Sequence, residues 1–310
     1  MTHYHFFAKR LNQFHMKKRE AIWFYIMVSP WIVGFLIFTL GPMIYSMYLS
    51  LTSWDLFNPP KFVWFKNYID LFTKDRIFWK TVGNTFYYGL ISMILGMVAS
   101  LWIASLLNKP LKGMRTYRTL LYIPATVPVV AGALLFIKLL APDAGLVNQF
   151  LALFGIDGPP WLLSPVWVKP ALILMSLWGV GGGVTLLLAG MKGIPSEFYE
   201  AAAIDGANSR QQFYYITLPM LSPVIFFNLV MGLIGSLQTF TEVYIVTGGG
   251  PNNASKMIVP YLFDNAFRWY KMGYASAIAW VLFGIALIFT IVVFRSSNLW
   301  VYYESEVKKS

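Results

Sequence analysis

The chain alternates between long apolar stretches and short polar ones. Six windows contain no Asp, Glu, Lys, Arg or His, and they lie at about 22–51, 81–107, 120–137, 171–191, 220–241 and 273–294. A membrane-spanning helix needs about 20 largely apolar residues, which is close to what each window supplies. The pattern therefore predicts an all-α membrane protein with six transmembrane helices.

The basic residues give this bundle an orientation. If the N-terminus lies inside, the inner segments hold 14 of the 24 lysines and arginines and the outer segments hold 10. Because cytoplasmic loops carry an excess of Lys and Arg, we expect a multi-pass protein with both termini in the cytoplasm. We interpret residues 1–20 as a cytoplasmic anchor. A cleaved signal peptide is disfavoured because the apolar run up to Leu51 is longer than its h-region.

Composition narrows the class further. Only 12% of residues are charged, against roughly 25% in soluble domains. The net charge of +11 comes from residues in segments beside the predicted spans, so anionic lipid explains it better than nucleic acid. The chain has no cysteine, which excludes disulfides and cysteine metal sites. We expect His3, His5 and His15, on the N-terminal tail, to be solvated, and we predict no metal site.

Two outer segments differ in character. Trp54 to Lys80 is aromatic and polar, and we favour an interfacial re-entrant segment over a ligand site because such residues gather at the head-group level. Ala141 to Pro170 is expected to form a compact extracytoplasmic loop with a short helix from Gly145 to Phe154. Whether that loop is a docking surface for an external protein stays open.

The segment from Pro195 to Pro219 is the polar exception late in the chain. Ser196 is a candidate cap for a helix over 197–205, and Gly206 is suited to end that helix in the left-handed conformation. A second helix is expected to begin at Ser209, with Gln212 completing a capping box. The sequence thus predicts two short helices hinged at a glycine between two spans.

This segment resembles the EAA loop of ABC-importer permeases, whose pattern is E-A-A, three residues, G, nine residues, then I-x-L-P. The matching residues, with Asp205 beside the glycine, are Glu200, Ala201, Ala202, Gly206, Ile216, Leu218 and Pro219. The resemblance implies that the two helices couple the permease to an ATPase. The alternative is an amphipathic cytoplasmic helix hairpin that has no role in coupling to an ATPase.

Missing motifs limit the chemistry of the chain itself. It lacks a G-x-x-x-x-G-K-[ST] phosphate loop, so any ATPase must be a separate polypeptide, and we expect a translocase component that is not an enzyme. The apolar windows hold no ionisable residue, which counts against an ion-coupled carrier and against an intramembrane hydrolase. The triplet Gly181–Gly183 interrupts a window and suggests either local unwinding or close helix packing.

The windows do contain neutral polar and aromatic residues of the kind that bind sugars. Candidate pathway residues, each also explicable as an interhelical hydrogen bond or an interfacial anchor, are Asn84, Tyr87, Trp178, Asn228, Gln238, Thr239 and Phe240, followed by Glu242 and Tyr244. The cluster from Gln238 to Tyr244 is the preferred site. The alternative substrate is glycerol phosphate or another polyol derivative, for which Lys138 is the available cation.

The stretch ending Val-Thr-Gly-Gly-Gly-Pro at Pro251, with Phe267 and 272–277, resembles the carbohydrate-uptake branch of these permeases. The resemblance implies a type I importer in the prokaryotic cell membrane, with an N-terminal part (1–80), a five-helix core (81–294) containing the coupling loop 192–219, and a cytoplasmic tail (295–310). It also implies a second unlike permease, two ATPase subunits that bind ATP and Mg, an extracytoplasmic solute-binding protein and a sugar substrate. From a different class, a stand-alone channel or ion-coupled carrier stays the alternative.

Overall fold

The computed structural model describes residues 2–109 and 112–302, and the side chains of residues 2–18 are outside that description. The side chains of the three tail histidines (His3, His5, His15) and all of residues 303–310 in the expected C-terminal tail therefore lie outside that description. The elements in chain order are α1 (Thr2–Phe35), the π-helical η1 (Leu36–Leu40), α2 (Gly41–Ser50), β1 (Thr52–Ser53), β2 (Lys61–Phe62), α3 (Lys66–Thr73), α4 (Arg76–Leu107), α5 (Met114–Thr126), α6 (Val129–Leu139), α7 (Leu146–Ala152), α8 (Val168–Trp178), α9 (Gly181–Lys192), α10 (Ser196–Ile204), α11 (Ser209–Gln212), η2 (Phe213–Thr217), α12 (Leu218–Leu237), α13 (Thr241–Val246), α14 (Ile258–Phe263), η3 (Asp264–Arg268) and α15 (Met272–Ser297).

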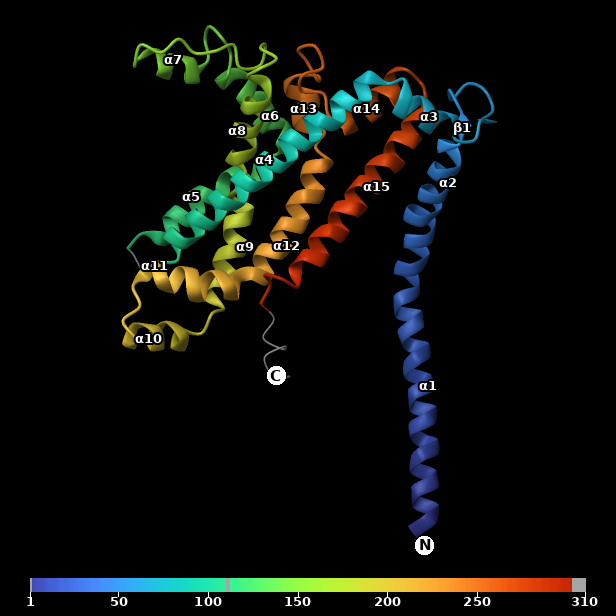
Figure 1. Cartoon of the computed structure of the whole chain (residues 1–310). Helices are drawn as coiled ribbons and strands as arrows, with labels where there is room; N and C mark the ends of the chain where they lie inside the picture. The colour runs from blue at the N-terminus through green and yellow to red at the C-terminus, as the bar shows by residue number, and fades with distance from the viewer. Residues whose placement is uncertain (1, 110–111, 303–310) are drawn as a thin grey trace.

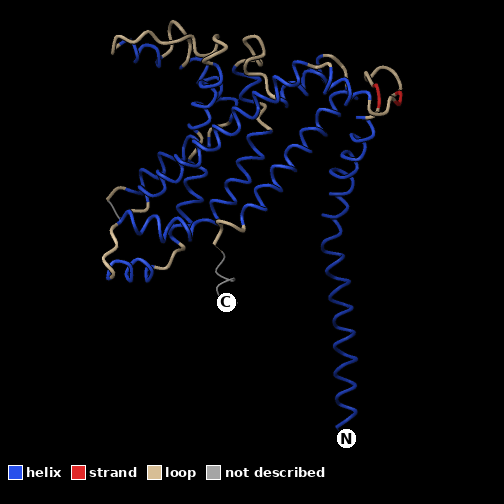
Figure 2. Tube along the Cα trace, in the orientation of Figure 1, coloured by secondary structure: helices blue, strands red, loops and turns tan. Residues whose placement is uncertain are grey.

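Helices dominate the described chain, and β1 and β2 form one short antiparallel hairpin (Figure 2). Four helical stretches are long and apolar enough to cross a membrane: Arg19–Ser50, Arg76–Leu107, Ser209–Val246 and Met272–Ser297. The other two windows form bent pairs, α5 with α6 at 96° and α8 with α9 at 46°. The span count is thus four, or six if each bent pair is one span, and the count of six stays a prediction.

Proline explains the sharper of the two bends. Val127 is extended, with φ −70° and ψ 130°, as expected for a residue that precedes a proline, here Pro128. The gentler bend falls at Gly179 and Val180, directly before the glycine triplet. A Cβ on Gly181 would lie 2.4 Å from the Leu121 carbonyl oxygen, so this position needs glycine for close helix packing.

Helix α4 is the centre of the bundle and packs against α8, α9 and α12, while α15 packs against α12 and α2. In Figure 1 the first span, α1 to α2, approaches the bundle only near its top and otherwise stands apart as a rod. None of the residues in its most apolar window is buried. The first span is therefore the one least covered by the rest of the chain.

The two ends of the bundle differ in content. In the orientation of Figure 1, the upper end holds the β1–β2 hairpin, α3, α7, α13 and α14, and the lower end holds α10 and α11. The start of α1 and the end of α15 lie on the lower side as well. The terms upper end and lower end are used in this sense below. The short helix α7 lies within the range expected for it, 145–154.

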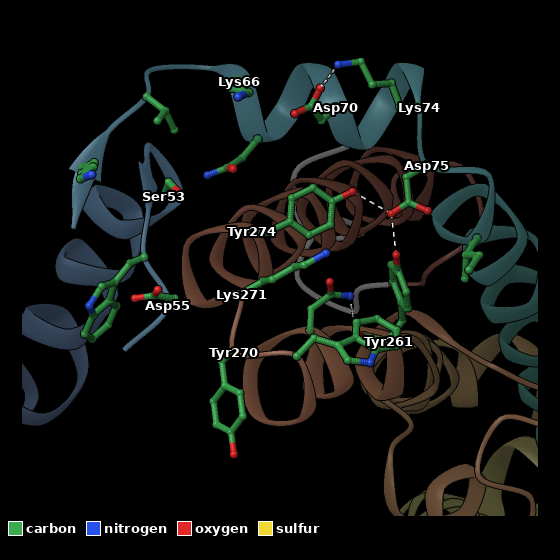
Figure 3. Close-up of a pocket in the computed structure, with 17 residues that line it drawn as sticks. Ser53, Asp55, Lys66, Asp70, Lys74, Asp75, Tyr261, Tyr270, Lys271 and Tyr274 are labelled. Carbon is green, nitrogen blue, oxygen red and sulfur yellow. Dashed lines mark hydrogen bonds and ion pairs between the residues drawn. The ribbon is translucent and has the colours of Figure 1, made fainter. Parts of the chain in front are cut away.

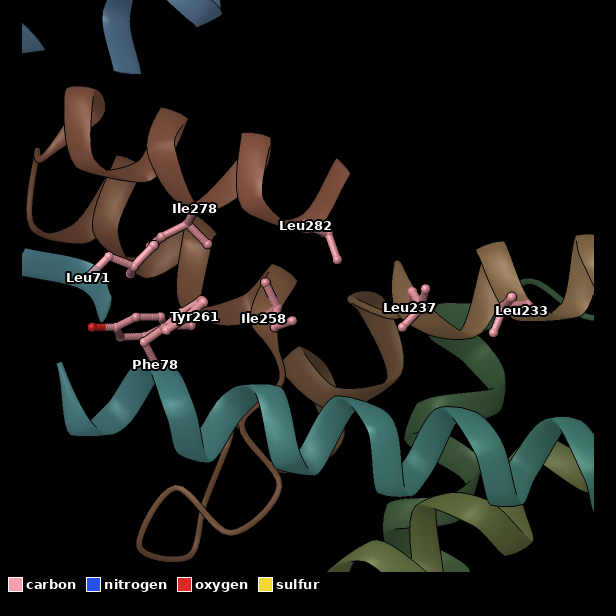
Figure 4. Close-up of a cluster of buried hydrophobic side chains, with 8 residues drawn as sticks. All are labelled: Leu71, Phe78, Leu233, Leu237, Ile258, Tyr261, Ile278 and Leu282. Atoms are coloured by element: carbon pink, nitrogen blue, oxygen red, sulfur yellow. The ribbon is translucent and has the colours of Figure 1, made fainter. Parts of the chain in front are cut away.

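The core joins elements that are distant in sequence. Figure 4 shows one cluster of buried side chains from α3, α4, α12, α14 and α15: Leu71, Phe78, Leu233, Leu237, Ile258, Tyr261, Ile278 and Leu282. A second cluster, lower in the bundle, joins α4, α9 and α12 around Leu187 and Leu221. At about 25 cal/mol per Å² of apolar area removed from water, such contacts stabilise the upper ends of α4 and α15 against each other.

The polar loop between 195 and 219 corrects three expectations. The capping box uses Asn208 with Gln211, one residue earlier than expected for Ser209 with Gln212, because Asn208 is the last extended residue, with ψ 167°, before the helix. Helix α10 starts at Ser196, and the N-cap residue is Pro195, whose side chain makes no capping bond. Moreover, α11 continues through η2 into α12, so the second helix is the start of a long span and not a short separate element.

Candidate functional site

The loop at the lower end presents the matched E-A-A residues on an uncovered helix. Helix α10 has no buried residue among those described, and Glu200 and Ala201 are exposed while Ala202 is half-buried. Ile204 is 87% exposed and Phe198 49% exposed. A short helix that leaves large apolar side chains uncovered is typical of a surface that meets a partner.

The C-terminal end of α10 nevertheless has a defined backbone conformation. Gly206 has φ +83°, the Ala207 N–H donates to the Ala202 carbonyl at 2.9 Å, and the Gly206 N–H donates to the Ala203 carbonyl at 3.1 Å. These two bonds form a Schellman motif, which requires the left-handed conformation at the glycine. The expectation that Gly206 ends the helix in that conformation is confirmed.

The second half of the loop is anchored to the bundle. The Asn208 side chain accepts from the Arg210 and Gln211 N–H groups at 3.0 Å each. The hydroxyls of Tyr199 and Thr217 lie 3.0 Å apart and link α10 to η2. Ile216, Leu218 and Pro219 are half-buried at the start of the span. Helix α10 is therefore bonded to η2, and η2 continues directly into α12.

A second candidate site lies where α12 ends. The helix stops at Leu237, and Gln238, Thr239 and Phe240 form a break before α13, within the apolar stretch Ser209–Val246. Such a break is tolerated in a span only where it is covered by protein or lines a water-filled path. Gln238 is exposed, and the Thr239 hydroxyl donates to the Ser236 carbonyl at 3.0 Å.

Four aromatic rings gather beside this break, and we call Phe240, Tyr244, Phe263 and Phe267 the aromatic cluster. Phe240 stacks on Tyr244 with ring centroids 5.0 Å apart, and Phe263 lies 5.0 Å from Phe240 and 4.9 Å from Phe267. Tyr244 is 36% exposed and Phe267 54% exposed. Partly exposed ring faces next to free amide and hydroxyl groups suit the stacking and hydrogen bonding of a sugar ring.

Phe263 is not a candidate residue from the sequence. Phe267 is named there only as part of the resemblance to carbohydrate-uptake permeases. The signal that could have found them is their separation of four residues in 263–267, which places both on one helix face. They come from α14 and η3, in a stretch that the charge pattern had assigned to an external loop.

Asn84 and Tyr87, two further candidate pathway residues, have contacts outside the aromatic cluster. Asn84 is 5% exposed, and its side-chain amide donates to the carbonyls of Asn253 and Lys256 at 2.9 Å each while its oxygen accepts from Lys169 at 3.3 Å. Tyr87 lies under the Lys169 ammonium, which is 4.8 Å from the ring centroid. Asn84 thus joins α4 to the 247–257 loop, while Tyr87 faces Lys169 of α8, and neither belongs to the aromatic cluster.

Trp178, Asn228 and Lys138 occupy surroundings separate from the aromatic cluster. Trp178 packs edge-on against Phe136, with ring centroids 5.7 Å apart. Asn228 donates to the carbonyl four residues earlier and lines a small cavity of about 110 Å³ between α4, α9 and α12. Glu242 lies in the first turn of α13, and Lys138 is exposed in the last turn of α6. The structure thus groups Gln238 to Tyr244 but not all of the predicted pathway residues.

A buried ion pair holds the elements that carry the aromatic cluster. The Lys256 ammonium lies 2.7 Å from Asp264, which is 2% exposed, and Arg268 approaches the other oxygen of that carboxylate at 3.2 Å. Because a buried charge is stable only when paired and hydrogen-bonded, this trio fixes the 247–257 loop against η3. No group of three or more His, Asp or Glu residues that could hold a metal occurs among the described residues.

Comparisons with known proteins give a consistent result. The family model for binding-protein-dependent transport system inner membrane components matches residues 60–301. The probable ABC transporter permease protein YesP of Bacillus subtilis (strain 168) is 43% identical over 91% of this chain and 92% of its own length. The trehalose/maltose transport system permease protein MalF of Thermococcus litoralis is 34% identical over 90% and 95%.

The fold has a close counterpart among solved structures. A chain from the crystal structure of a bacterial alginate ABC transporter, in complex with an alginate pentasaccharide-bound periplasmic protein, superposes with a TM-score of 0.80 and 26% sequence identity. The match covers 90% of this chain and 95% of that chain. The likeness therefore extends over nearly the whole length of both.

Proposed function

Because the chain belongs to the family of binding-protein-dependent transport system inner membrane components, we propose that it is a permease subunit of an ATP-driven importer for a sugar or oligosaccharide. The observation that carries this proposal is the exposed, glycine-capped helix α10, on which the E-A-A residues of the family pattern lie at one end of the bundle. The similarity to transporter subunits over more than nine-tenths of their length supports it.

The substrate class follows from the aromatic cluster and from the relatives. MalF is named for trehalose and maltose, and the structural relative belongs to an alginate transporter. In this chain, the exposed Gln238 amide and the rings of Tyr244 and Phe267 supply the polar and stacking groups that a sugar needs. We propose that Gln238, Thr239, Phe240, Glu242 and Tyr244, with Phe263 and Phe267, contact the substrate on its way across.

The proposed coupling uses α10 as the part held by an ATPase. Glu200 offers its carboxylate to a basic group of the ATPase, Ala201 and Ala202 keep that helix face thin, and Gly206 fixes the angle between α10 and α11. ATP and Mg bind to the ATPase subunits. Closure of the ATPases moves α10, and the continuous helix from Ser209 into α12 transmits the movement to the break at Gln238.

The uncovered first span supports a further subunit. The window within Arg19–Ser50 has no buried residue, and Trp23, Phe24 and Trp31 are all more than half exposed. In the proposed assembly a second, unlike permease covers part of this surface and lipid covers the rest. The lower end then faces the cytoplasm with both termini, and the upper end faces the solute-binding protein.

Site-specific cross-linking tests the coupling proposal directly, because the chain has no cysteine of its own. An Ala201→Cys variant is labelled with a cysteine-reactive photo-cross-linker in membranes that contain the whole transporter, and the expected product joins it to the ATPase subunit. Leu153→Cys, at an 80% exposed position at the upper end, is the matched control and should not give that product. Cross-linking of the ATPase to Leu153→Cys, or to neither variant, would contradict the proposal.

A transport assay tests the substrate site. In vesicles with the assembled complex, uptake should stop when ATP is withheld, which separates an importer from a channel. Gln238→Ala and Phe240→Leu should change the range of sugars taken up while leaving the complex intact. Unchanged uptake of every sugar by both variants would remove these residues from the pathway.

A further inference from the structure

A cavity outside the proposed sugar pathway lies at the upper end, where Tyr261 and Asn265 of its lining come from the same α14–η3 segment as Phe263 and Phe267. It has a volume of about 1100 Å³ and opens at the upper end between the β1–β2 hairpin and α3 on one side and α14, η3 and the start of α15 on the other (Figure 3). None of the residues proposed for the sugar pathway lines it. We call it the upper cavity.

Its three carboxylates already have partners in the cavity wall. Asp70 pairs with Lys74 at 2.5 Å, and Asp75 accepts from the hydroxyls of Tyr261 and Tyr274 (Figure 3). Asp55 accepts from Asn58, which holds the pKa of that carboxyl below its usual value. Asp55 and Asp75 are thus held by neutral donors, and with four lysines against three aspartates the cavity lining carries one net positive charge.

Three lysines that line the same cavity have no such partner. Lys61, Lys66 and Lys271 make no ion pair or hydrogen bond through their ammonium groups to any described residue. They come from β2, α3 and the residue before α15, so the fold brings together charges separated by more than 200 residues of sequence. Three ammonium groups around one cavity favour an anionic ligand.

The surroundings of the cavity are those of a membrane interface. Spans α2 and α15 end and begin at its wall, at Ser50 and Met272. Large apolar side chains on the hairpin, α3 and the start of α4 are uncovered, with Trp64 68% and Trp79 53% exposed. Tryptophan, tyrosine and lysine gather at the head-group level of bilayers, so the anion nearest to this cavity is a lipid head group.

We propose that the upper cavity binds the phosphate of an anionic glycerophospholipid from the outer leaflet, through Lys61, Lys66 and Lys271. The acyl chains then lie along α3 and the outer ends of α2 and α15, against the uncovered apolar side chains. The assignment to the outer leaflet rests on the proposed function, which places the upper end outside. Phosphate binding itself does not depend on transport.

Native mass spectrometry of the purified full-length chain tests the proposal, with phosphatidylglycerol and phosphatidylcholine of the same acyl chains as probes. We expect selective retention of phosphatidylglycerol. Since each lysine near a charged surface contributes about a fivefold preference, the triple variant Lys61→Gln, Lys66→Gln and Lys271→Gln should weaken that retention roughly a hundredfold and leave phosphatidylcholine unchanged. A thermal unfolding scan shows whether the variant is folded, and the single Lys271→Gln variant should lose about fivefold.

The control is Lys138→Gln, which removes one exposed lysine at the outer end of α6, away from the cavity. It should retain phosphatidylglycerol like the parent. Equal retention by the triple variant, or an equal loss in Lys138→Gln, would overturn the proposal. So would displacement of the lipid by millimolar inorganic phosphate, which indicates a soluble phosphate ligand, or preferential binding of a uronate oligosaccharide, which indicates a sugar site. This experiment measures lipid binding and not transport. Its outcome therefore neither supports nor contradicts the proposal that the chain is an importer permease.

Discussion

The two ends of the bundle are held together in different ways. At the upper end, side chains far apart in sequence bond to one another: Lys256 with Asp264, Asn84 with the 253–256 backbone, and Tyr261 and Tyr274 with Asp75. At the lower end, the described contacts of α10 are mostly local backbone bonds, with Tyr199 and Thr217 as its side-chain link to the bundle. The upper end is tied together by side-chain contacts within this chain, whereas α10 at the lower end has no buried residue.

This difference determines what a substitution should do at each end. A change at the upper end removes a contact that the folded chain needs, so it should lower the free energy of unfolding. A change at α10 removes little that the single chain uses, so it should leave stability nearly intact and act on coupling. Substitutions at the two ends should therefore differ in their cost to stability, from Asp264→Asn at the upper end down to Tyr261→Phe.

Asp264→Asn should have the largest effect. It leaves Lys256, which is 9% exposed, as a buried ammonium group without its counter-charge, and breaking such a pair costs about 3–5 kcal/mol. We expect a clear fall in the thermal unfolding midpoint of the purified protein. Arg268→Gln is the control, because that side chain is 62% exposed and a surface pair contributes about 0–1 kcal/mol. Similar falls in the unfolding midpoint of both variants would show that the buried Lys256–Asp264 pair stabilises the fold no more than the exposed Arg268 side chain does.

Asn84→Ala should destabilise by about 2–3 kcal/mol, since it leaves two carbonyls of the 247–257 loop without a donor. If Asn84 is mainly a structural residue, uptake should fall only as far as the amount of folded protein falls. Surface labelling of folded transporter beside an uptake assay separates the two quantities. If Asn84→Ala changed the range of sugars taken up while the amount of folded protein stayed normal, Asn84 would instead be a residue of the substrate pathway. Asn228→Ala, whose amide bonds within its own helix, is the matched control and should cost less.

The sequence was sufficient where the determinants are local. Hydrophobic windows located four helical stretches long enough to span and two bent helix pairs, and Gly206 located the end of α10, because apolar length and left-handed backbone are properties of a few neighbouring residues. The capping box was misplaced by one residue because Asn208–Gln211 and Ser209–Gln212 both fit its pattern. Only the backbone conformation after Gly206, in which Asn208 is extended, selects the Asn208–Gln211 pair.

What could not be predicted depends on contacts across the fold. Asn84 looked like a pathway amide, and nothing within its window indicates partners 169 and 172 residues away. Lys256 and Asp264 belong to no sequence motif, yet they form a buried pair. The break at Val127 could have been expected from the proline that follows it. Phe263 needs the tertiary fold to reach Phe240.

Gly206→Val tests the lower end and should change stability by only about 1–2 kcal/mol, the cost of the left-handed conformation for a side chain. A Cβ at this position meets no atom within 4 Å, so the cost is conformational and not steric. We expect normal amounts of assembled complex, retained ATP hydrolysis and an uptake rate lower by about tenfold or more.

Two variants sharpen this prediction. Gly206→Asn should retain most of the uptake, because asparagine tolerates positive φ better than other residues with a side chain. Gly235→Ala, at another glycine with no atom within 4 Å but without positive φ, controls for the added methyl group. If Gly206→Val transported at the parental rate, the conformation of that glycine would have no part in coupling.

Tyr261→Phe should have the smallest effect, about 1 kcal/mol near neutral pH, because Asp75 keeps its bonds to Tyr274 and to the Phe78 N–H. Burial, and then the hydrogen bond to Asp75, raise the pKa of the Tyr261 phenol well above its usual 10. A pKa raised on folding means that the contribution of the neutral phenol is complete below pH 10 and is lost as pH rises through the folded-state value. The parent should therefore lose stability above pH 10 more steeply than Tyr261→Phe, and the two unfolding curves should converge. Measurement of both midpoints from pH 8 to 11 checks this, and parallel curves over that range would show that the phenol is not held neutral by the fold.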